Sequence, residues 1–177
     1  NFIDGLNGLI LGYFTSIILI IFYLNLNVSL EIENNLIISI LIILVYLFIL
    51  NINNKLFMGD SGSYLLSLLS GYLLIKIYEV SPQISPYFII LLLWYPCFEN
   101  LFSIIRKFSL KKSPIAADNN HLHQLIFIYL KKKLVSKNFN INNISSFIII
   151  FYNLFIFSIS LVDPSNSQLQ ITLVIIN

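Results

Sequence analysis

Residues 5–30 read GLNGLILGYFTSIILIIFYLNLNVSL, and no Asp, Glu, Lys or Arg interrupts them. A helix needs about 20 mostly apolar residues to cross the hydrocarbon core of a bilayer. This run exceeds that length, and it is too apolar to cover the surface of a soluble domain. It therefore predicts a transmembrane helix over residues 8–26.

Four further charge-free runs follow, and the composition of the whole chain agrees with them. Charged residues make up only 10% of the sequence, whereas soluble domains contain about 25%. The predicted fold class is an all-α integral membrane protein, a polytopic bundle of about five transmembrane helices plus a truncated sixth in the apolar C-terminal residues. The predicted spans are residues 8–26, 36–52, 62–77, 86–105 and 144–161.

The two ends of the chain predict that it is an internal piece of a longer protein. Asn1 is not a start residue, and residues 169–177 are too short to span a bilayer. We interpret residues 1–177 as a single membrane domain. The single cysteine, Cys97, excludes an internal disulfide and any multi-cysteine metal site. Because it lies in an apolar stretch, we interpret it as a buried, inert thiol.

The distribution of basic residues predicts the orientation of the chain. Alternate loops fall on opposite sides of the membrane, and one side holds residues 1–6, 55–63 and the long loop 106–143 with every Lys and Arg except Lys76. Because Lys and Arg favour the cytoplasmic side, we expect these segments to be cytoplasmic. A net charge of +2 does not indicate nucleic-acid binding. We attribute the richness in Asn to genomic base composition and take no function from it.

The loop before the third span carries the sequence FMGDSGS at residues 57–63. Gly59 and Gly62 let the backbone adopt positive φ and approach a ligand closely. A helix N-terminus binds phosphate, and a carboxylate beside a phosphate suits Mg²⁺, so Asp60 is a candidate metal ligand and catalytic residue. The alternative is that Asp60 and Ser61 only cap the third helix. A chymotrypsin-like serine site is excluded, since no His precedes Ser61.

A second polar cluster occupies residues 1–8, NFIDGLNG. Asn1, Asp4 and Asn7 are three residues apart, so in a helix they share one face. Three polar groups on one face at the membrane edge suit a nucleotide or a metal. The alternative is a plain helix start, where Asp4 is favourable because of the helix dipole.

The third cluster contains the two histidines of the chain, His121 and His123. On an extended segment their side chains would point the same way and suit a metal or a phosphate. The evidence for a structural zinc site is weak, because a third ligand is missing. Contact with a phosphate is therefore favoured, with the lysines at 131–133 nearby. The alternative for the lysines is a solvated positive-inside loop. Glu99, inside the fourth span about two turns before Arg106, is interpreted as structural.

Taken together, the three clusters resemble those of the polyprenyl-phosphate N-acetylhexosamine-1-phosphate transferases, glycosyltransferase family 4. The family pattern Asn-x-x-Asp-Gly-x-(Asp/Asn)-Gly-Leu is matched by residues 1–9, and Phe-x-Gly-Asp-x-Gly-Ser by residues 57–63. The family's cytoplasmic His-x-His is matched by His121 and His123. Order, spacing and placement agree over nearly the whole chain, which resembles the C-terminal half of such an enzyme.

The resemblance implies an activity, partners and roles. Such enzymes move a sugar-1-phosphate from a UDP-N-acetylhexosamine to a polyprenyl phosphate at the bacterial cytoplasmic membrane and release UMP. The oligomeric state stays open, a homodimer included. The implied site residues are Asn1 and Asp60 as ligands of Mg²⁺ (or Mn²⁺), Asp60 and Asp4 as catalytic residues, Phe57 and Asn7 against uracil, and His121 and His123 against phosphate or sugar.

The chain differs from the family pattern in two respects, and two other functions are alternatives to the transferase. The family's paired aspartates belong to an early span that this chain does not contain, so the segment is not expected to catalyse alone. The His-Leu-His-Gln form at 121–124 resembles the GlcNAc-1-phosphate, O-antigen or teichoic-acid initiating branch; the triple-histidine muramyl-pentapeptide branch is the alternative. A transporter would place polar groups at mid-membrane, and a structural membrane subunit would leave three ordered motifs as coincidence.

Overall fold

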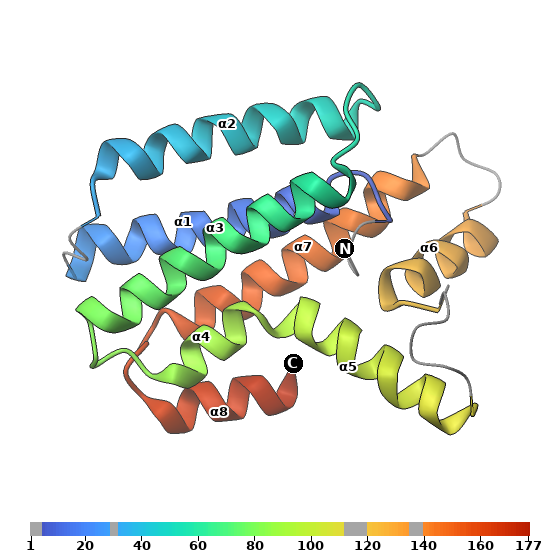
Figure 1. Cartoon of the computed structure of the whole chain (residues 1–177). Coiled ribbons are helices and arrows are strands. Elements are labelled where there is room, and N and C mark those ends of the chain that lie inside the picture. Colours follow the sequence, from blue (N-terminus) through green and yellow to red (C-terminus); the bar gives the residue numbers. More distant parts are fainter. Residues whose placement is uncertain (1–4, 29–31, 112–119, 135–139) are drawn as a thin grey trace.

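The computed structural model describes residues 5–28, 32–111, 120–134 and 140–177, and over these residues it contains eight helices and no strand. Figure 1 shows their arrangement. The helices are α1 (Leu9–Val28), α2 (Asn34–Ile52), α3 (Gly59–Val80), α4 (Pro86–Leu92), α5 (Trp94–Ser109), α6 (Leu122–Lys133), α7 (Ile141–Ser160) and α8 (Ser167–Ile176).

The predicted membrane fold is confirmed. Within the described residues four helices, α1, α2, α3 and α7, are long and apolar enough to cross a membrane. The pair α4 and α5 gives a fifth candidate span if the two are taken together. The apolar C-terminal segment forms α8, a short helix that packs against α4.

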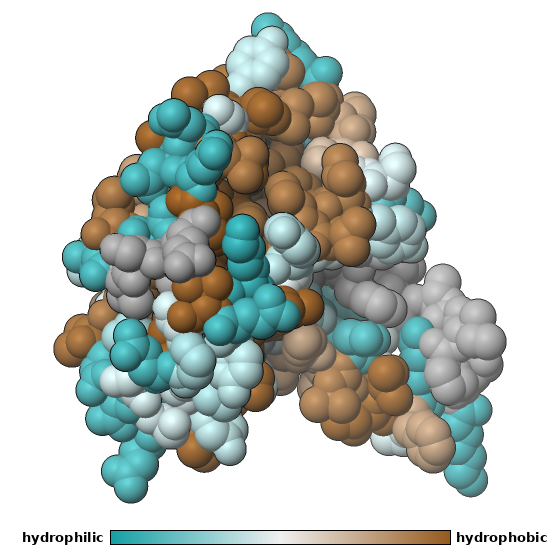
Figure 2. All heavy atoms as spheres, turned by 60° about the vertical axis from the view of Figure 1, so that its left-hand side comes forward, coloured by the Kyte–Doolittle hydropathy of each residue, from teal (hydrophilic) through white to brown (hydrophobic). Residues whose placement is uncertain are grey.

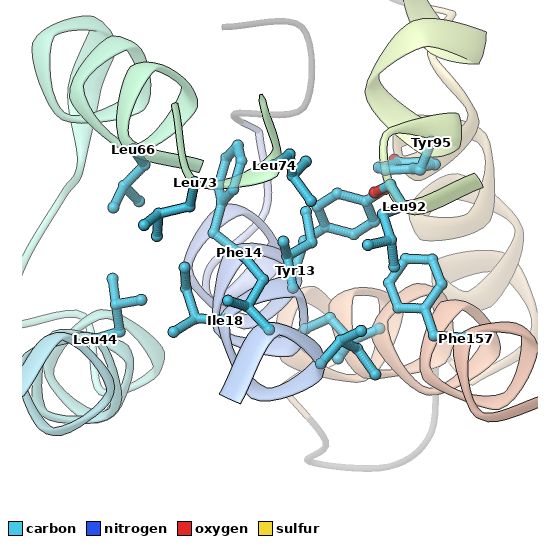
Figure 3. Packing of buried hydrophobic residues seen from close by; sticks show 14 of the residues in the cluster. Tyr13, Phe14, Ile18, Leu44, Leu66, Leu73, Leu74, Leu92, Tyr95 and Phe157 are labelled. Carbon is cyan, nitrogen blue, oxygen red and sulfur yellow. The ribbon is translucent and has the colours of Figure 1, made fainter. Parts of the chain in front are cut away.

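The first span is the central helix of the bundle. Helices α2, α3 and α7 all pack against α1, which is buried over most of its surface. Figure 3 shows Phe14 and Ile18 on the side of α2 and α3, with Tyr13 directed towards Leu92 and Phe157. Lipid is as apolar as leucine, so close packing drives such association. Gly12 permits it here, since a Cβ at this position would collide with Ile150 of α7.

Successive spans alternate in direction, which separates the loops into two groups (Figure 1). One group, here called the motif end, holds residues 5–8, residues 53–58, α6 and the start of α7. The other group, the opposite end, holds residues 32–33, 81–85 and 161–166. Figure 2 brings the opposite end forward and shows hydrophilic residues in front of hydrophobic flanks. The grouping is the one predicted from the basic residues.

The fourth span is not the single helix predicted over residues 86–105. It breaks at Leu93, and α4 and α5 meet at a bend of 71°. Pro96 explains the break, because a proline has no N–H and its ring clashes with the carbonyl four residues earlier, here that of Leu92. The hydroxyl of Tyr13 donates a hydrogen bond of 2.7 Å to the oxygen of Leu92 instead. The break also places Pro96 in the first turn of α5, where it is tolerated.

The surface of α5 corrects the interpretation of Cys97, which is exposed rather than buried. The helix is two-sided. Its polar buried face repeats every four residues, whereas its outward face carries large apolar side chains. The buried face consists of Tyr95, Glu99, Ser103 and Lys107.

Candidate functional site

The second motif lies at the start of α3, at the motif end of the bundle. Gly59 has a φ of +64°, a conformation that favours glycine, and it is the first residue of α3. Asp60 follows in the first turn and is exposed. The N-cap position belongs to Met58, so neither Asp60 nor Ser61 is the cap. The interpretation of Asp60 as a mere helix cap is therefore wrong, and its carboxylate faces solvent beside the free N–H groups of the helix start.

Asn51 joins the first motif to the second. Gly8, with a φ of +80°, donates its backbone N–H to the side-chain oxygen of Asn51. The amide nitrogen of Asn51 donates in turn to the backbone oxygen of Leu56, at 2.7 Å. Asn51 is buried, so both backbone groups are satisfied by one side chain at the end of α2.

Asn7 is held between two other segments of the motif end. Its backbone N–H donates to the side-chain oxygen of Asn142 at 2.6 Å, and its side-chain amide donates to that of Asn54. Asn143 adds a bond of 3.0 Å to the backbone oxygen of Ile52. The asparagines that we attributed to base composition therefore connect the first loop, the α2–α3 loop and the start of α7.

The two histidines lie side by side at the start of α6. His121 is the N-cap, with extended backbone, and His123 is in the first turn, so the segment is a helix start rather than a continuous extended strand. Their rings are 5.5 Å apart between centroids and nearly parallel, at 5°. Gln124 fixes the helix start by accepting a hydrogen bond of 3.2 Å from the backbone N–H of His121.

Glu99 of α5 faces both histidines. Its Oε2 lies 3.0 Å from Nδ1 of His121, and its Oε1 lies 3.4 Å from Nδ1 of His123. The hydroxyl of Tyr95 donates to Oε1 at 3.1 Å and lies 3.4 Å from Nδ1 of His123. All four side chains carry polar atoms that need partners when buried, and here they partner one another.

The third motif also touches the first. A Cβ built on Gly5 would lie only 2.7 Å from Nε2 of His123, so the glycine backbone passes directly over this ring nitrogen. His123 is 1% exposed, and its Nε2 has no hydrogen-bond partner among the described residues. The loop of residues 5–8 is thus flanked by the α2–α3 loop through Asn7 and Gly8, and by the histidines through Gly5.

An apolar cavity of about 310 Å³ adjoins the histidine cluster. Tyr95 belongs to both, since it lines the cavity and donates to Glu99. The cavity lies between α5, α6 and α7, and its lining residues are Trp94, Tyr95, Phe98, Leu122, Ile126, Ile148, Ile149, Tyr152, Asn153 and Asn177.

The remaining predicted residues divide into two groups. Phe57, in the loop before α3, is 76% exposed, so its ring face is accessible. Asn1 and Asp4 lie outside the described residues. In the part of the chain that the structure describes, no group of three or more His, Cys, Asp or Glu side chains is arranged so that it could hold a metal ion. The exposed Asp60 carboxylate still fits Mg²⁺, which takes one or two carboxylates together with substrate phosphates.

Fold and site together define a polytopic helical membrane protein whose described motif residues gather at one end of the bundle. Residues 1–78 match the family model described as glycosyl transferase family 4. This part of the chain belongs to that family, which confirms the family predicted from the motifs.

The chain was also compared with known proteins and with solved structures. A Bacillus subtilis (strain 168) protein named "Probable undecaprenyl-phosphate N-acetylglucosaminyl 1-phosphate transferase" is 33% identical over 127 residues, which cover 69% of this chain and 32% of that protein. The chain thus spans about a third of the length of this relative. No solved structure matches the chain.

Three of the site's contributors were not identified from the sequence. Asn51 and Asn54 were set aside with the other asparagines, and Glu99 was interpreted as structural. The spacing of Tyr95, Glu99 and Ser103 by four residues was a usable signal, because such positions share one face of a helix. For Asn51 there was no comparable signal, since Gly8, one of its two partners, is 43 residues away along the chain.

Proposed function

We propose that the full-length protein transfers N-acetylhexosamine-1-phosphate, with GlcNAc-1-phosphate as the preferred group, from a UDP-sugar to a polyprenyl phosphate and releases UMP. The polyprenyl phosphate is undecaprenyl phosphate, and the reaction starts the synthesis of a cell-envelope polysaccharide. One observation carries the proposal. Three motifs that are far apart in the sequence adjoin at one end of the bundle, through Asn51, Asn7 and the contact of Gly5 with His123.

The nucleotide half of the substrate suits the exposed side of the motif end. Phe57 offers an accessible ring on which uracil would stack, and Asn7 bonds Asn54 in the same α2–α3 loop. Asp60 and Asn1 would hold Mg²⁺, and Asp4 would line the sugar side. The metal supplies charge neutralisation on the pyrophosphate when bound. The N–H groups at the start of α3 add dipole attraction for the same anion.

The lipid half suits the apolar surroundings of the histidines. A polyprenyl phosphate carries its phosphate at headgroup level and its chain in the hydrocarbon. The histidine pair lies at the motif end, and the apolar cavity bounded by Tyr95 begins beside it. We therefore assign the contact with phosphate to His121 and His123, while the prenyl chain would follow an apolar path. The attack of the lipid phosphate on the sugar-bound phosphorus is favoured by such positioning.

A transporter fits the arrangement less well. It requires polar groups at mid-membrane, lining a path between the two sides. Here the residues of the three motifs lie at the motif end, and the buried face of the central helix α1 is mostly apolar. The muramyl-pentapeptide branch is the second candidate within the same reaction type, and the single His-x-His at 121–123 favours the simpler donor.

A radiolabel assay tests the proposal. Membranes containing the full-length protein are incubated with Mg²⁺, undecaprenyl phosphate and labelled UDP-GlcNAc, and label is counted in the butanol-extracted lipid. We expect lipid label and an equal amount of UMP, both abolished by a chelator. Label that enters lipid only from UDP-GalNAc would correct the sugar. No label from any UDP-N-acetylhexosamine, muramyl-pentapeptide donor included, would refute the transferase.

A further inference from the structure

Glu99 is an acidic side chain buried inside a membrane-spanning segment, where ionisable groups are rare and are usually paired or functional. It is 1% exposed and lies on α5, one turn after Pro96. A buried carboxylate is costly unless it is fully hydrogen-bonded. Both of its oxygens are engaged, by His121 on one side and by His123 and Tyr95 on the other.

The geometry determines which histidine nitrogens face Glu99. In both rings the nitrogen near the carboxylate is Nδ1. An ionised carboxylate can only accept hydrogen bonds, so each Nδ1 must carry its proton to bond there. Since Nδ1 of each ring faces Glu99, Nε2 lies on the far side of each ring from the carboxylate. For His123 that direction leads to Gly5, where Nε2 is buried and without a partner among the described residues.

We propose that Glu99 is a positioning residue, which holds His121 and His123 parallel with both Nδ1–H groups engaged and so presents their Nε2 atoms to phosphate oxygens of the substrate. This inference rests on the proposed function for the identity of the ligand. An imidazolium, which carries a proton on each ring nitrogen, can donate Nδ1–H to Glu99 on one side and Nε2–H to a phosphate oxygen on the other. The two histidines then act as a matched pair rather than as two loop residues.

The local fold supports this role in two ways. The break at Leu93 turns α5 away from the line of α4, and Tyr13 stabilises it by bonding the oxygen of Leu92. Glu99 follows on the redirected helix. On the other side of His123, Gly5 lies against Nε2, which is buried, and only a residue without a Cβ can approach the ring this closely. Both features fix the ring of His123 between Glu99 of α5 and the loop of residues 5–8.

The first experiment reads the histidine protons directly. The full-length protein is labelled with ¹⁵N-histidine in detergent micelles, and His121 and His123 are assigned by His→Gln variants. Long-range ¹⁵N–¹H spectra then report which ring nitrogen carries a proton. We expect protonated Nδ1 on both rings. In Glu99→Gln, which keeps the volume but adds an N–H₂ donor, at least one ring must accept through Nδ1 instead. Glu79→Gln, an exposed acid at the opposite end, should change neither ring.

The second experiment separates positioning from a merely structural role. With labelled UDP-GlcNAc, Glu99→Gln should lower kcat/KM about ten-fold or more per folded protein, as loss of an orienting partner does. Glu99→Asp, which keeps the carboxylate, should retain more activity than Glu99→Gln. In a His123→Gln background the further effect of Glu99→Gln should shrink to about two-fold, because the residue acts through the histidines.

The outcomes are distinguishable from failure of the proposed function. Wild-type protein without transferase activity would refute the proposed function, whereas the spectra would still decide the inference. Unprotonated Nδ1 on both rings of the wild type, or a Glu99→Gln spectrum identical to it, would overturn the positioning role. So would a Glu99→Gln effect that adds in full to that of His123→Gln.

Discussion

At the scale of single residues, Asn51 shows how one side chain can set the geometry of two loops. It accepts from the N–H of Gly8 and donates to the oxygen of Leu56, so it joins the first motif to the residue before Phe57. Removal of one partner from a buried backbone group costs about 1–3 kcal/mol. A single substitution here disturbs both loops.

We therefore expect Asn51→Leu to lower the Tm of the full-length protein in detergent by several degrees, because two backbone groups lose their partner. The matched control is Asn53→Leu, since Asn53 is exposed and bonds only within its own helix, to Ile49. Tm follows from the loss of tryptophan or tyrosine fluorescence on heating. Equal shifts in the two variants would show that Asn51 has no special role.

Phe57 carries a prediction on substrate affinity. Stacking of a base on an aromatic ring is worth about 1–3 kcal/mol, so Phe57→Leu should raise KM for UDP-GlcNAc about ten-fold with little change in kcat. Phe108→Leu is the control, because both phenylalanines are 76% exposed and Phe108 lies on α5. Initial rates over a range of UDP-GlcNAc concentrations measure both constants. An unchanged KM in Phe57→Leu would show that the Phe57 ring does not bind uracil.

At this scale the sequence predicted the backbone conformation of single residues better than their side-chain contacts. The positive φ of Gly59 and the place of Asp60 at a helix start follow from local chemistry, and both are confirmed. The bonds of Asn51 and Asn7 depend on loops brought together by the fold. An asparagine-rich sequence does not reveal which asparagines make them.

At the scale of elements, the broken fourth span directs Glu99 towards the histidines. Hydropathy measures how apolar a segment is, and it does not report whether the helix is continuous. Pro96 was visible in the sequence, but proline is tolerated in spans when other groups satisfy the freed carbonyl. The group that does so, the hydroxyl of Tyr13, is 79 residues away from Leu92 along the chain.

Pro96→Ala should reduce the bend between α4 and α5, because alanine restores the N–H that can bond the oxygen of Leu92. Spin labels at Tyr87→Cys and Phe108→Cys, in a Cys97→Ser background, measure the separation by electron–electron double resonance. A straight helix would place these positions about 32 Å apart, at 1.5 Å per residue. The bend of 71° brings them closer.

The labels should therefore move apart in Pro96→Ala, and transfer activity should fall as Glu99 moves. Pro82→Ala, in the loop before α4, serves as the control and should leave the separation unchanged. A separation in Pro96→Ala equal to that of the wild type would mean that packing of α4 on α8 sets the bend without the proline.

At the scale of the whole molecule, charge and fold agree on the topology. The loops that carry almost all basic residues gather at the motif end, and the acidic loops gather at the opposite end. This agreement was predictable, because span length and the bias of Lys and Arg are properties of composition. The packing of α2, α3 and α7 around α1 was not, since it depends on local fits such as Gly12 against Ile150.

The orientation predicts which positions are accessible outside the cell. In a Cys97→Ser background, Asn166→Cys at the opposite end should react with a membrane-impermeant maleimide in intact cells. Lys55→Cys at the motif end should react only after permeabilisation. Reaction of Lys55→Cys in intact cells would show that the predicted orientation is wrong and that the motif end lies outside, away from a cytoplasmic nucleotide.

The most direct measurement compares Asp60→Asn with Glu33→Gln in the lipid-label assay, at equal protein abundance. Asp60 lies in the first turn of α3 at the motif end, whereas Glu33 is exposed at the opposite end. Loss of the proposed Mg²⁺ contact would remove several kcal/mol of stabilisation, and each 1.4 kcal/mol is ten-fold in rate, so we predict a fall of about 100-fold or more for Asp60→Asn. Glu33→Gln should retain wild-type activity. Full activity in Asp60→Asn would contradict the account, because the start of α3 could not then be the catalytic site.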